Sequence, residues 1–506
     1  MKIFKTEQIQ QIDAATMRYE PISSIDLMER AARTLTDSIM EKFGGQGYFF
    51  AIFAGPGNNG GDALAIARML TILNEKTEVW LINPKSKLSP DCEKNLERLK
   101  SCNTTIHIYN NEFTTPQLPK NCIIIDGIFG SGLNKPATGL FAEAIRFINS
   151  SHAKIVAIDI PSGLHGERNN FDAEGIVHAH TTLTLQFPKI AFFMPENDKF
   201  TGEWEILNIG LSSRAIEEQE SNLYYTVKEE IAAMIPPRGK FSHKGNYGHA
   251  LLVAGSLGMA GAAILSAKAA LRSGVGLLSV CTPLCNNTIL QTSVPEAMTL
   301  PNNGENNLCE LPAIERYTAI AIGPGLGTAK DTEKALLQLI NDCNVPMVLD
   351  ADALNILSKH PESLKQLPAN SIITPHPGEF ARLTGGIKNR EEQLAAATEL
   401  AQKCNICIVL KGAYTAVCSP DGNIYFNSSG NPGMATGGSG DTLTGVAVAL
   451  LARGYDSTTA ARIAVYIHGL AGDIAAVKYS ETALTAGDII DALPSAWKII
   501  EQCYQE

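Results

Sequence analysis

The 506-residue sequence predicts an α/β protein with two unlike domains, each built on a mostly parallel sheet between layers of helices. Short, almost continuously apolar runs alternate with helical segments, a pattern typical of parallel strands buried on both faces. The pattern occurs twice, with different motifs in each half. A polar stretch, residues 211–225, lies between the halves and reads as a linker. We therefore expect domains of residues 1–220 and 221–506.

The first half contains six strand-like runs. A helix is expected over residues 25–43, where apolar residues recur at helical spacing, and another over residues 63–74. The strand-like runs are YFFAIFAG, EVWLIN, CIIIDGIFG, KIVAIDIPSG, TTLTLQF and GEWEILNIG. Because open α/β sheets bind ligands at the carboxyl ends of their strands, the loops after these runs are the candidate binding elements.

The second half repeats the alternation. Residues 261–274 predict an alanine-rich helix closed by a glycine, and a long apolar helix follows a glycine-rich loop that ends at Asp441. The strand-like runs are HALLVAGS, VGLLSVCTP, TAIAIGPG, PMVLDADALN, SIITPHPGEF and CIVLKGAY.

Charge and cysteine usage narrow the function classes. The formal net charge of −11 argues against nucleic acid or an anionic membrane as a partner, because both need a basic surface. The most apolar stretch, residues 250–280, is interrupted by Lys268 and Arg272, which argues against a membrane span. The 11 cysteines are scattered through hydrophobic segments, which predicts buried thiols in a cytoplasmic protein.

Two pairs of residues have the spacing of metal or redox sites. Cys404 and Cys407 form a CxxC, but no second pair follows, so we interpret the spacing as chance at a helix–strand junction. His178 and His180 alternate along a strand without a nearby third ligand, and we interpret them as strand-edge residues.

The segment FAGPGNNGGDALAIARML joins a strand to a helix through four glycines and two asparagines. It is neither a phosphate-binding GK[ST] loop nor a strict GxGxxG. Free N–H groups at a helix start can still hold a phosphate without any side-chain charge. A purely structural turn explains the paired Asn58 and Asn59 less well than a ligand loop does.

Two further loops follow strands in the first half. Asp126 precedes a turn through Gly130, Ser131 and Gly132, and Asp159 precedes Pro161, Ser162 and Gly163. Amide, hydroxyl and carboxylate oxygens of this kind suit a cation that makes weak geometric demands. A carboxylate at a strand end is also a candidate general acid or base. Loop capping explains Asp126 and Asp159 about equally well.

In the second half, GGSGD at residues 437–441 begins a helix. The amides of Gly438, Ser439 and Gly440 can point at one anion, assisted by the helix dipole. Asp441 then stands where a hydroxyl would meet a transferring phosphoryl group, which it could orient or deprotonate. A plain glycine-rich cap leaves this acid unexplained.

Three further loops at strand ends contain residues that favour a nucleotide site. Lys411 and Gly412 end a strand, and His376 stands between two prolines at another strand end, where a substrate contact is favoured over a simple turn. Asp350 and Asp352 are candidates either for the site or for capping the following helix.

The motifs GxGNNGGD, DxxFGSGL and DIPSGL, in this order, resemble those of the NAD(P)H-hydrate epimerases over residues 6–210. The resemblance implies a Rossmann-like three-layer sandwich that interconverts the R and S forms of the hydrated nicotinamide at C6. It further implies a potassium ion held by Asn59, Asp126 and Ser162, and Asp159 at the reacting carbon. The implied substrate contacts are Asn58, Asn59, Gly60, Gly61, Asp62, Gly130, Ser131, Gly132, Leu133, Asn134, Lys135, Pro136 and Asp159.

The sequence departs from that family at two places. Ala63 stands where the family usually has a fourth glycine, and its methyl group is expected to narrow the substrate approach. The stretch HGERNNFDAEG, residues 165–175, differs from the usual DADTG-like run.

The series HKGNYGH, GAAILSAKAALRSGVGLLSV, AIGPGLG, VLDADALN, TPHPGEF, LKGAYT and NPGMATGGSGD is similar to the ADP-dependent NAD(P)H-hydrate dehydratases, over residues 225–497. This resemblance implies a ribokinase-like domain. The implied substrate contacts are Ala260, Gly325, His376 and Asp441. The implied nucleotide contacts are Lys411, Gly412, Ala413, Tyr414, Thr415, Gly438, Ser439 and Gly440.

Together the two resemblances imply one chain that repairs hydrated NADH and NADPH, with ADP as co-substrate, Mg²⁺ accompanying it, and Asp159 and Asp441 as the catalytic residues. Phosphoryl transfer from ADP would make the C6 hydroxyl a good leaving group, and elimination would restore the cofactor. Two alternatives remain at this point. One is a ribokinase-like small-molecule kinase, which GGSGD fits equally well, and the other is a non-catalytic N-terminal nucleotide-binding module. We also expect a homo-oligomer.

Overall fold

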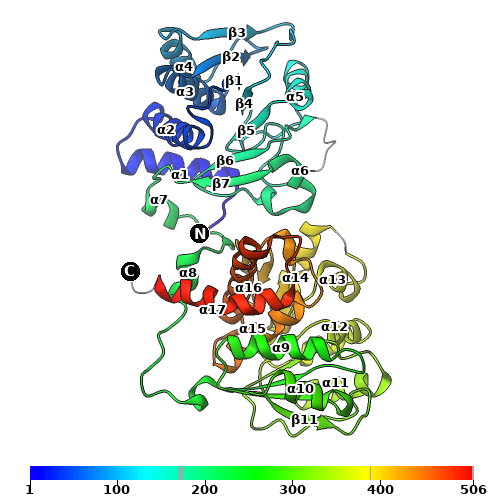
Figure 1. Cartoon of the computed structure of the whole chain (residues 1–506). Coiled ribbons are helices and arrows are strands. Elements are labelled where there is room, and N and C mark those ends of the chain that lie inside the picture. Colours follow the sequence, from blue (N-terminus) through cyan, green and yellow to red (C-terminus); the bar gives the residue numbers. More distant parts are fainter. Residues whose placement is uncertain (170–174, 388, 504–506) are drawn as a thin grey trace. The chain divides into compact units, whose positions relative to one another are not determined.

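A computed structural model describes residues 1–169, 175–387 and 389–503. Within these residues the chain divides into two compact units. The N-terminal unit is Lys2–Ser221, and the C-terminal unit is Met1 with Asn222–Glu506. In each unit a central sheet lies among helices (Figure 1), which confirms the predicted α/β class.

The N-terminal unit has a sheet that is parallel throughout its described strands, in the order β3-β2-β1-β4-β5-β6-β7. Its strands are β1 (Phe49–Ala54), β2 (Lys76–Ile82), β3 (Thr105–Tyr109), β4 (Cys122–Gly127), β5 (Lys154–Ile158), β6 (Thr181–Leu185) and β7 (Glu203–Leu207). The chain reverses direction across the sheet between β1 and β4. This switch point opens a crevice beyond the carboxyl ends of the two strands, the usual ligand position in such a sheet.

Helices cover both faces of this sheet. The apolar sides of α2, α3 and α4 pack on one face through residues such as Leu35, Leu64 and Leu96, and α5 covers the other through Ile145 and Ile148. The helices are α1 (Thr6–Tyr19), α2 (Ser24–Phe43), α3 (Asn58–Ile72), α4 (Pro90–Lys100), α5 (Leu140–Ser150), α6 (Asp198–Thr201) and α7 (Ser213–Glu217).

The polar stretch 211–225 spans the boundary between the two units, which falls after Ser221, and much of it is folded. Helix α7 forms within it, held by Arg214, whose guanidinium lies 4.4 Å from the centre of the Tyr19 ring on α1. The hydroxyl of Tyr19 donates to Glu218 at 2.6 Å. A surface helix needs few apolar residues when aromatic and charged side chains hold it against a neighbouring helix, which explains how this polar segment folds.

The C-terminal unit has a ten-stranded sheet in the order β11-β10-β9-β12-β13-β14-β15-β16-β17-β8. The pairs β15–β16 and β16–β17 are antiparallel, and the other pairs are parallel. The strands are β8 (Leu223–Tyr225), β9 (His249–Val253), β10 (Leu277–Pro283), β11 (Met298–Asn302), β12 (Ala319–Ile322), β13 (Met347–Leu349), β14 (Ile372–Ile373), β15 (Cys407–Leu410), β16 (Ala416–Cys418) and β17 (Ile424–Phe426).

The largest core of this unit lies between the sheet and α9, α15, α16 and α17. The helices are α8 (Lys228–Ala233), α9 (Ala260–Arg272), α10 (Asn287–Ser293), α11 (Lys330–Asp342), α12 (Asp352–Leu357), α13 (Pro377–Leu383), α14 (Arg390–Cys404), α15 (Ser439–Ala452), α16 (Ser457–Tyr479) and α17 (Ala486–Gln502). Helix α16 is long and apolar enough to cross a membrane by composition, but most of it is buried in this core.

Helices α9 and α15 approach each other unusually closely. A Cβ atom on Gly445 of α15 would lie 2.1 Å from the carbonyl oxygen of Ser266 and 2.9 Å from the Cβ of Ala269, both on α9. Alanines on the facing side of α9 allow the same approach. Gly445 therefore determines how closely α15 packs against α9. The GGSGD motif lies at the start of α15.

We expect Gly445→Ala to destabilise the protein by about 1–3 kcal/mol, because the added methyl group forces two packed helices apart. Thermal and urea unfolding of the full chain measure the change. Gly261→Ala is the matched control, since a Cβ there meets nothing within 4 Å and alanine favours the helix. Equal stability of Gly445→Ala and the wild type would show that the helix contact yields without cost.

Candidate active sites

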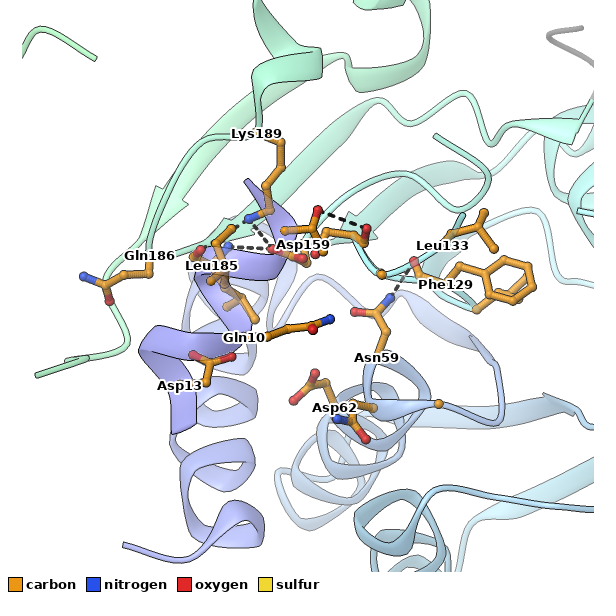
Figure 2. Close-up of a pocket in the computed structure, with 18 of the residues that line it drawn as sticks. Gln10, Asp13, Asn59, Asp62, Phe129, Leu133, Asp159, Leu185, Gln186 and Lys189 are labelled. Atoms are coloured by element: carbon orange, nitrogen blue, oxygen red, sulfur yellow. Dashed lines mark hydrogen bonds and ion pairs between the residues drawn. The ribbon is translucent and has the colours of Figure 1, made fainter. Parts of the chain in front are cut away.

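A cavity of about 540 Å³ opens at the switch point of the N-terminal unit. Helix α1 and the loops after β1, β4, β5 and β6 form its walls (Figure 2). The lining includes these residues predicted from the sequence: Asn58, Asn59, Asp62, Gly130, Ser131, Gly132, Leu133, Asn134 and Asp159. The lining does not include Gly60, Gly61, Lys135 and Pro136.

A compact oxygen-rich network joins the three strand-end loops beside this cavity. The backbone N–H and hydroxyl of Ser162 donate to the two carboxylate oxygens of Asp126 at 2.8 and 2.6 Å. The Ser162 hydroxyl in turn accepts from the N–H of Phe129 at 2.8 Å, and Asn59 Nδ2 donates to the Phe129 carbonyl at 2.9 Å. Burial raises the pKa of Asp126 to about 6, against the lowering effect of these donors.

The donor set of this network fits a monovalent cation. Asp126 is fully buried and forms no ion pair with any described lysine, arginine or histidine. The Asn59 amide uses its nitrogen for hydrogen bonds, which leaves its oxygen available. Over the described residues, no group of three His, Cys, Asp or Glu side chains suits a metal.

Asp159 forms a buried ion pair that the sequence did not reveal. The Lys189 ammonium lies 2.7 Å from Asp159 Oδ1, and its side chain is only 3% exposed. It also donates to Thr184 Oγ1 and to the Phe187 carbonyl, both at 3.0 Å. Asp159 itself has a φ of 65°, a conformation that is uncommon outside glycine and is often found at functional positions.

Two further carboxyl groups face the same cavity. Asp13 comes from α1, and Asp62 lies in the first turns of α3. Burial, and next the negative charge of Asp159, raise the pKa of Asp13 to about 7. The same two causes raise the pKa of Asp62 well above its usual value. Both groups therefore hold a proton more readily than an ordinary aspartic acid does.

Ala63 lies in the apolar core and is absent from the cavity lining. A Cβ on Gly127 would lie 2.6 Å from the Ala63 methyl group, so the methyl fills space beside the β4 backbone. The expectation that it narrows the substrate approach is wrong for this reason. Of the second departure, HGERNNFDAEG, residues 170–174 lie outside the described residues.

In the C-terminal unit, α15 begins at Ser439 behind Gly438, whose φ is 90°. This left-handed conformation turns the chain into the helix. The Ser439 N–H donates to the Thr436 carbonyl at 3.4 Å, whereas the N–H groups of Gly440 and Asp441 have no hydrogen bond to any described residue. Asp441 stands in the first turn. Burial, then the charge of Asp350, raise the pKa of Asp441 to about 6, and Lys411 opposes them.

Lys411 and Asp350 form the charged centre of this site. Lys411 Nζ donates to Asp350 Oδ1 at 2.9 Å and lies 3.8 Å from Glu379 Oε2. Thr444, one turn along α15, donates to Asp350 Oδ2 at 2.8 Å. A Cβ on Gly440 would lie 3.5 Å from Lys411 Nζ, so the lysine reaches the helix start. Asp350 therefore belongs to the site and does not cap α12, whose N-cap is Ala351.

The loops predicted as substrate and nucleotide contacts surround this centre. His376 caps α13, accepting from the N–H of Gly378 at 3.0 Å, and half of its side chain is exposed. The Lys411 N–H donates to the Pro375 carbonyl at 3.0 Å, which joins the His376 and Lys411 loops. Thr415 Oγ1 donates to the Gly412 carbonyl at 3.0 Å and closes the turn 412–415, which contains Ala413 and Tyr414.

Gly325 lies against the start of α9, the helix that begins at Ala260. A Cβ on Gly325 would lie 2.9 Å from the Met259 Cβ and 3.0 Å from the Ala262 Cβ. Ser256 donates to the Gly325 carbonyl at 2.8 Å. A glycine is therefore required where this loop packs against α9, and the contact of Ala260 and Gly325 with the substrate stays a prediction.

The residues that imitate metal or redox sites are structural. Cys404 and Cys407 are buried free thiols, and burial raises the pKa of both. His180 Nδ1 accepts from the Ile155 N–H at 3.1 Å, directly before β6 begins at Thr181. Burial lowers the pKa of His178.

Comparisons with known proteins found a matching family model for each of the two units. The family model described as NAD(P)H-hydrate dehydratase matches residues 250–495, and the one described as YjeF-related protein N-terminus matches residues 24–191. A bifunctional NAD(P)H-hydrate repair enzyme of Moorella thermoacetica is 35% identical over 99% of this chain and 98% of its own length. That of Thermofilum pendens is 32% identical over 100% of this chain and 98% of its own.

One solved structure resembles the C-terminal unit. It is an ADP/ATP-dependent NAD(P)H-hydrate dehydratase of Bacillus subtilis, co-crystallised with ATP and Mg²⁺. It is 35% identical, covers 56% of this chain and 100% of its own, and gives a TM-score of 0.50.

Proposed function

This chain belongs to the bifunctional NAD(P)H-hydrate repair enzymes, and from this premise we propose that its two units carry out successive steps on hydrated NADH and NADPH. The N-terminal unit epimerises the hydrates at C6. The C-terminal unit dehydrates the S form and converts ADP into AMP and phosphate. The observation that supports this best is the free start of α15, with Asp441 beside the Lys411–Asp350 pair.

Dehydration needs the C6 hydroxyl to become a good leaving group. Asp441 accepts the hydroxyl proton while the oxygen attacks the terminal phosphorus of ADP, and AMP leaves. The amides of Gly438, Ser439 and Gly440 stabilise charge on the moving phosphoryl group. The C6–O bond then breaks with loss of a C5 proton, which yields phosphate and the dihydronicotinamide. Lys411 offsets the charge of Asp350, so that the site tolerates a phosphate.

The nucleotide is proposed to be ADP with Mg²⁺, held by Lys411–Thr415 and the start of α15. The Bacillus subtilis relative was crystallised with ATP and Mg²⁺, which supports an adenine nucleotide with Mg²⁺ as co-substrate. Hydrate turnover measured side by side with ADP and ATP tests the choice. We further propose a homo-oligomer located in the cytoplasm, and light scattering gives the mass of the purified assembly.

The decisive assay supplies purified protein with ADP and an equal mixture of R- and S-hydrates of NADPH. Recovery of NADPH absorbance beyond the amount of S-hydrate supports both activities, because the R form must first be epimerised. A small-molecule kinase would consume the nucleotide without restoring NADPH. A plateau at the S-hydrate content would leave only the dehydratase and would indicate a non-catalytic N-terminal module.

We propose that Asn59, Asp126 and Ser162 hold a potassium ion, which would fix the loops that carry the substrate. The buried Asp126 carboxylate, with no cationic side chain paired to it among the described residues, supports this. We expect KCl to raise the unfolding temperature of the chain relative to tetramethylammonium chloride at equal ionic strength. Asp126→Asn should abolish the difference. An equal effect of KCl on the wild type and Asp126→Asn would contradict the assignment.

A further inference from the structure

Three carboxyl groups share the N-terminal cavity, but only one has a counter-ion. Asp159 pairs with Lys189 at 2.7 Å and also accepts from the Leu185 N–H at 3.2 Å. Asp13 and Asp62 have no hydrogen bond or ion pair to any residue that the structure describes. Asp62 is only 8% exposed and lines the cavity. A buried carboxyl group without a protein partner is costly, so its partner is expected to be a ligand.

Asp159, which has a counter-ion, lies on a different wall of the cavity from Asp62 and Asp13, which have none in the described part of the chain. In Figure 2, Asp159 and Lys189 lie on one side of Gln10, and Asp62 and Asp13 lie on the other. The walls differ in charge compensation as well, because the Lys189 ammonium pairs with Asp159, whereas burial raises the pKa of Asp62, which has no such partner among the described residues. Paired carboxyls whose environments favour opposite protonation states are typical of an acid and a base acting on one substrate.

We propose that Asp62 is a second catalytic residue of the epimerase, which gives a proton to the departing C6 oxygen while Asp159 receives one from the incoming water on the other face. This inference rests on the proposed function. It makes inversion a dehydration followed by a rehydration, with the ring intact throughout.

The proposed inversion consists of loss of water from C6 and addition of water to the opposite face. The proton of Asp62 moves to the C6 hydroxyl, the C6–O bond breaks, and water leaves while the N1 lone pair forms an N1=C6 iminium. Water then adds to the opposite face of C6, the iminium electrons return to N1, and Asp159 takes the extra proton. The reverse inversion uses the same groups with their roles exchanged, so a single proton on the Asp62–Asp159 pair serves both directions.

The test uses Asp62→Asn in the full chain. Asparagine has the shape of the protonated aspartic acid and still donates a hydrogen bond, but it cannot transfer a proton. We expect kcat for epimerisation to fall about 10²–10⁴-fold with KM changed only a few-fold. Asp91→Asn is the matched control, since Asp91 is a buried carboxyl near Asp62 that binds Ser24 at 2.5 Å outside the cavity. It should keep the wild-type rate.

Urea unfolding of the full chain reports whether the N-terminal unit of each variant is folded, and dehydration of S-hydrate reports whether the C-terminal unit is intact. If the wild type epimerises and Asp62→Asn keeps its kcat, the role of Asp62 is overturned while the proposed function stands. If the wild type itself does not interconvert the hydrates, the proposed function fails.

An isotope experiment tests the route separately. In H₂¹⁸O, each enzymatic inversion should place one ¹⁸O at C6, after subtraction of spontaneous exchange. Inversion with the original oxygen retained would indicate ring opening at the N1–C6 bond and would overturn the dehydration step.

Discussion

Asp441→Asn is expected to lower kcat of dehydration by about 10²–10⁴-fold, the usual contribution of a positioned general base. The residue stands in the first turn of α15, next to the free amides that would hold the phosphoryl group. Asparagine keeps the shape of the side chain but cannot accept the hydroxyl proton. Recovery of NADPH absorbance from S-hydrate and ADP measures the rate.

The pH profile gives a second readout of the same group. Burial raises the pKa of Asp441 to about 6, and a base must be ionised to act. Wild-type kcat/KM should therefore rise as pH increases through about 6 and then level off, and Asp441→Asn should lack this rise.

Two controls accompany the variant. Asp331→Asn, which removes an exposed carboxylate from the first turn of α11, should retain the wild-type rate and profile. Epimerisation by Asp441→Asn should also be unchanged, because that site lies in the other unit. Wild-type dehydration by Asp441→Asn would exclude it as the base.

Most strands were predictable because a parallel sheet covered on both faces needs continuous apolar runs. The runs at β1, β4 and β12 are fully or almost fully buried, as that argument requires. Several edge and hairpin strands were not identified, among them β3, β16 and β17, although the edge strand β7 was. Strand β3 is mostly half-buried, and β16 and β17 have only three residues each, too few to show a period.

The positions of the site loops were also predictable, because glycines mark where the backbone must turn or approach a ligand. Gly438 illustrates this with its φ of 90° at the start of α15. Contacts between residues that are far apart in the sequence could not be predicted from any local sequence pattern. Lys189 is a single lysine in an apolar run, and Asp13 looks like an ordinary polar residue of an amphipathic helix. Asp350 left two interpretations open until the fold placed it beside Lys411, 61 residues away.

Lys189→Met is expected to destabilise the N-terminal unit by about 3–5 kcal/mol and to remove epimerisation. Breaking a buried ion pair leaves the remaining charge without compensation, which costs much more than the pair contributes. Here the remaining charge is Asp159, whose cavity already contains the carboxyl groups of Asp13 and Asp62. Urea unfolding of the full chain measures stability, and chiral separation of the hydrates measures epimerisation. Lys42→Met, which removes an exposed pair with Glu205, should cost at most about 1 kcal/mol.

The double variant Lys189→Met with Asp159→Asn separates the two roles of the pair. Replacing both charges removes the unpaired carboxylate, so most of the lost stability should return. Epimerisation should not return, because asparagine at 159 cannot take a proton from water. If stability stayed low in the double variant, the hydrogen bonds from Lys189 to Thr184 and the Phe187 carbonyl would be the larger contribution. If epimerisation returned, proton transfer through Asp159 would be excluded, and the buried pair would serve the fold of the cavity alone.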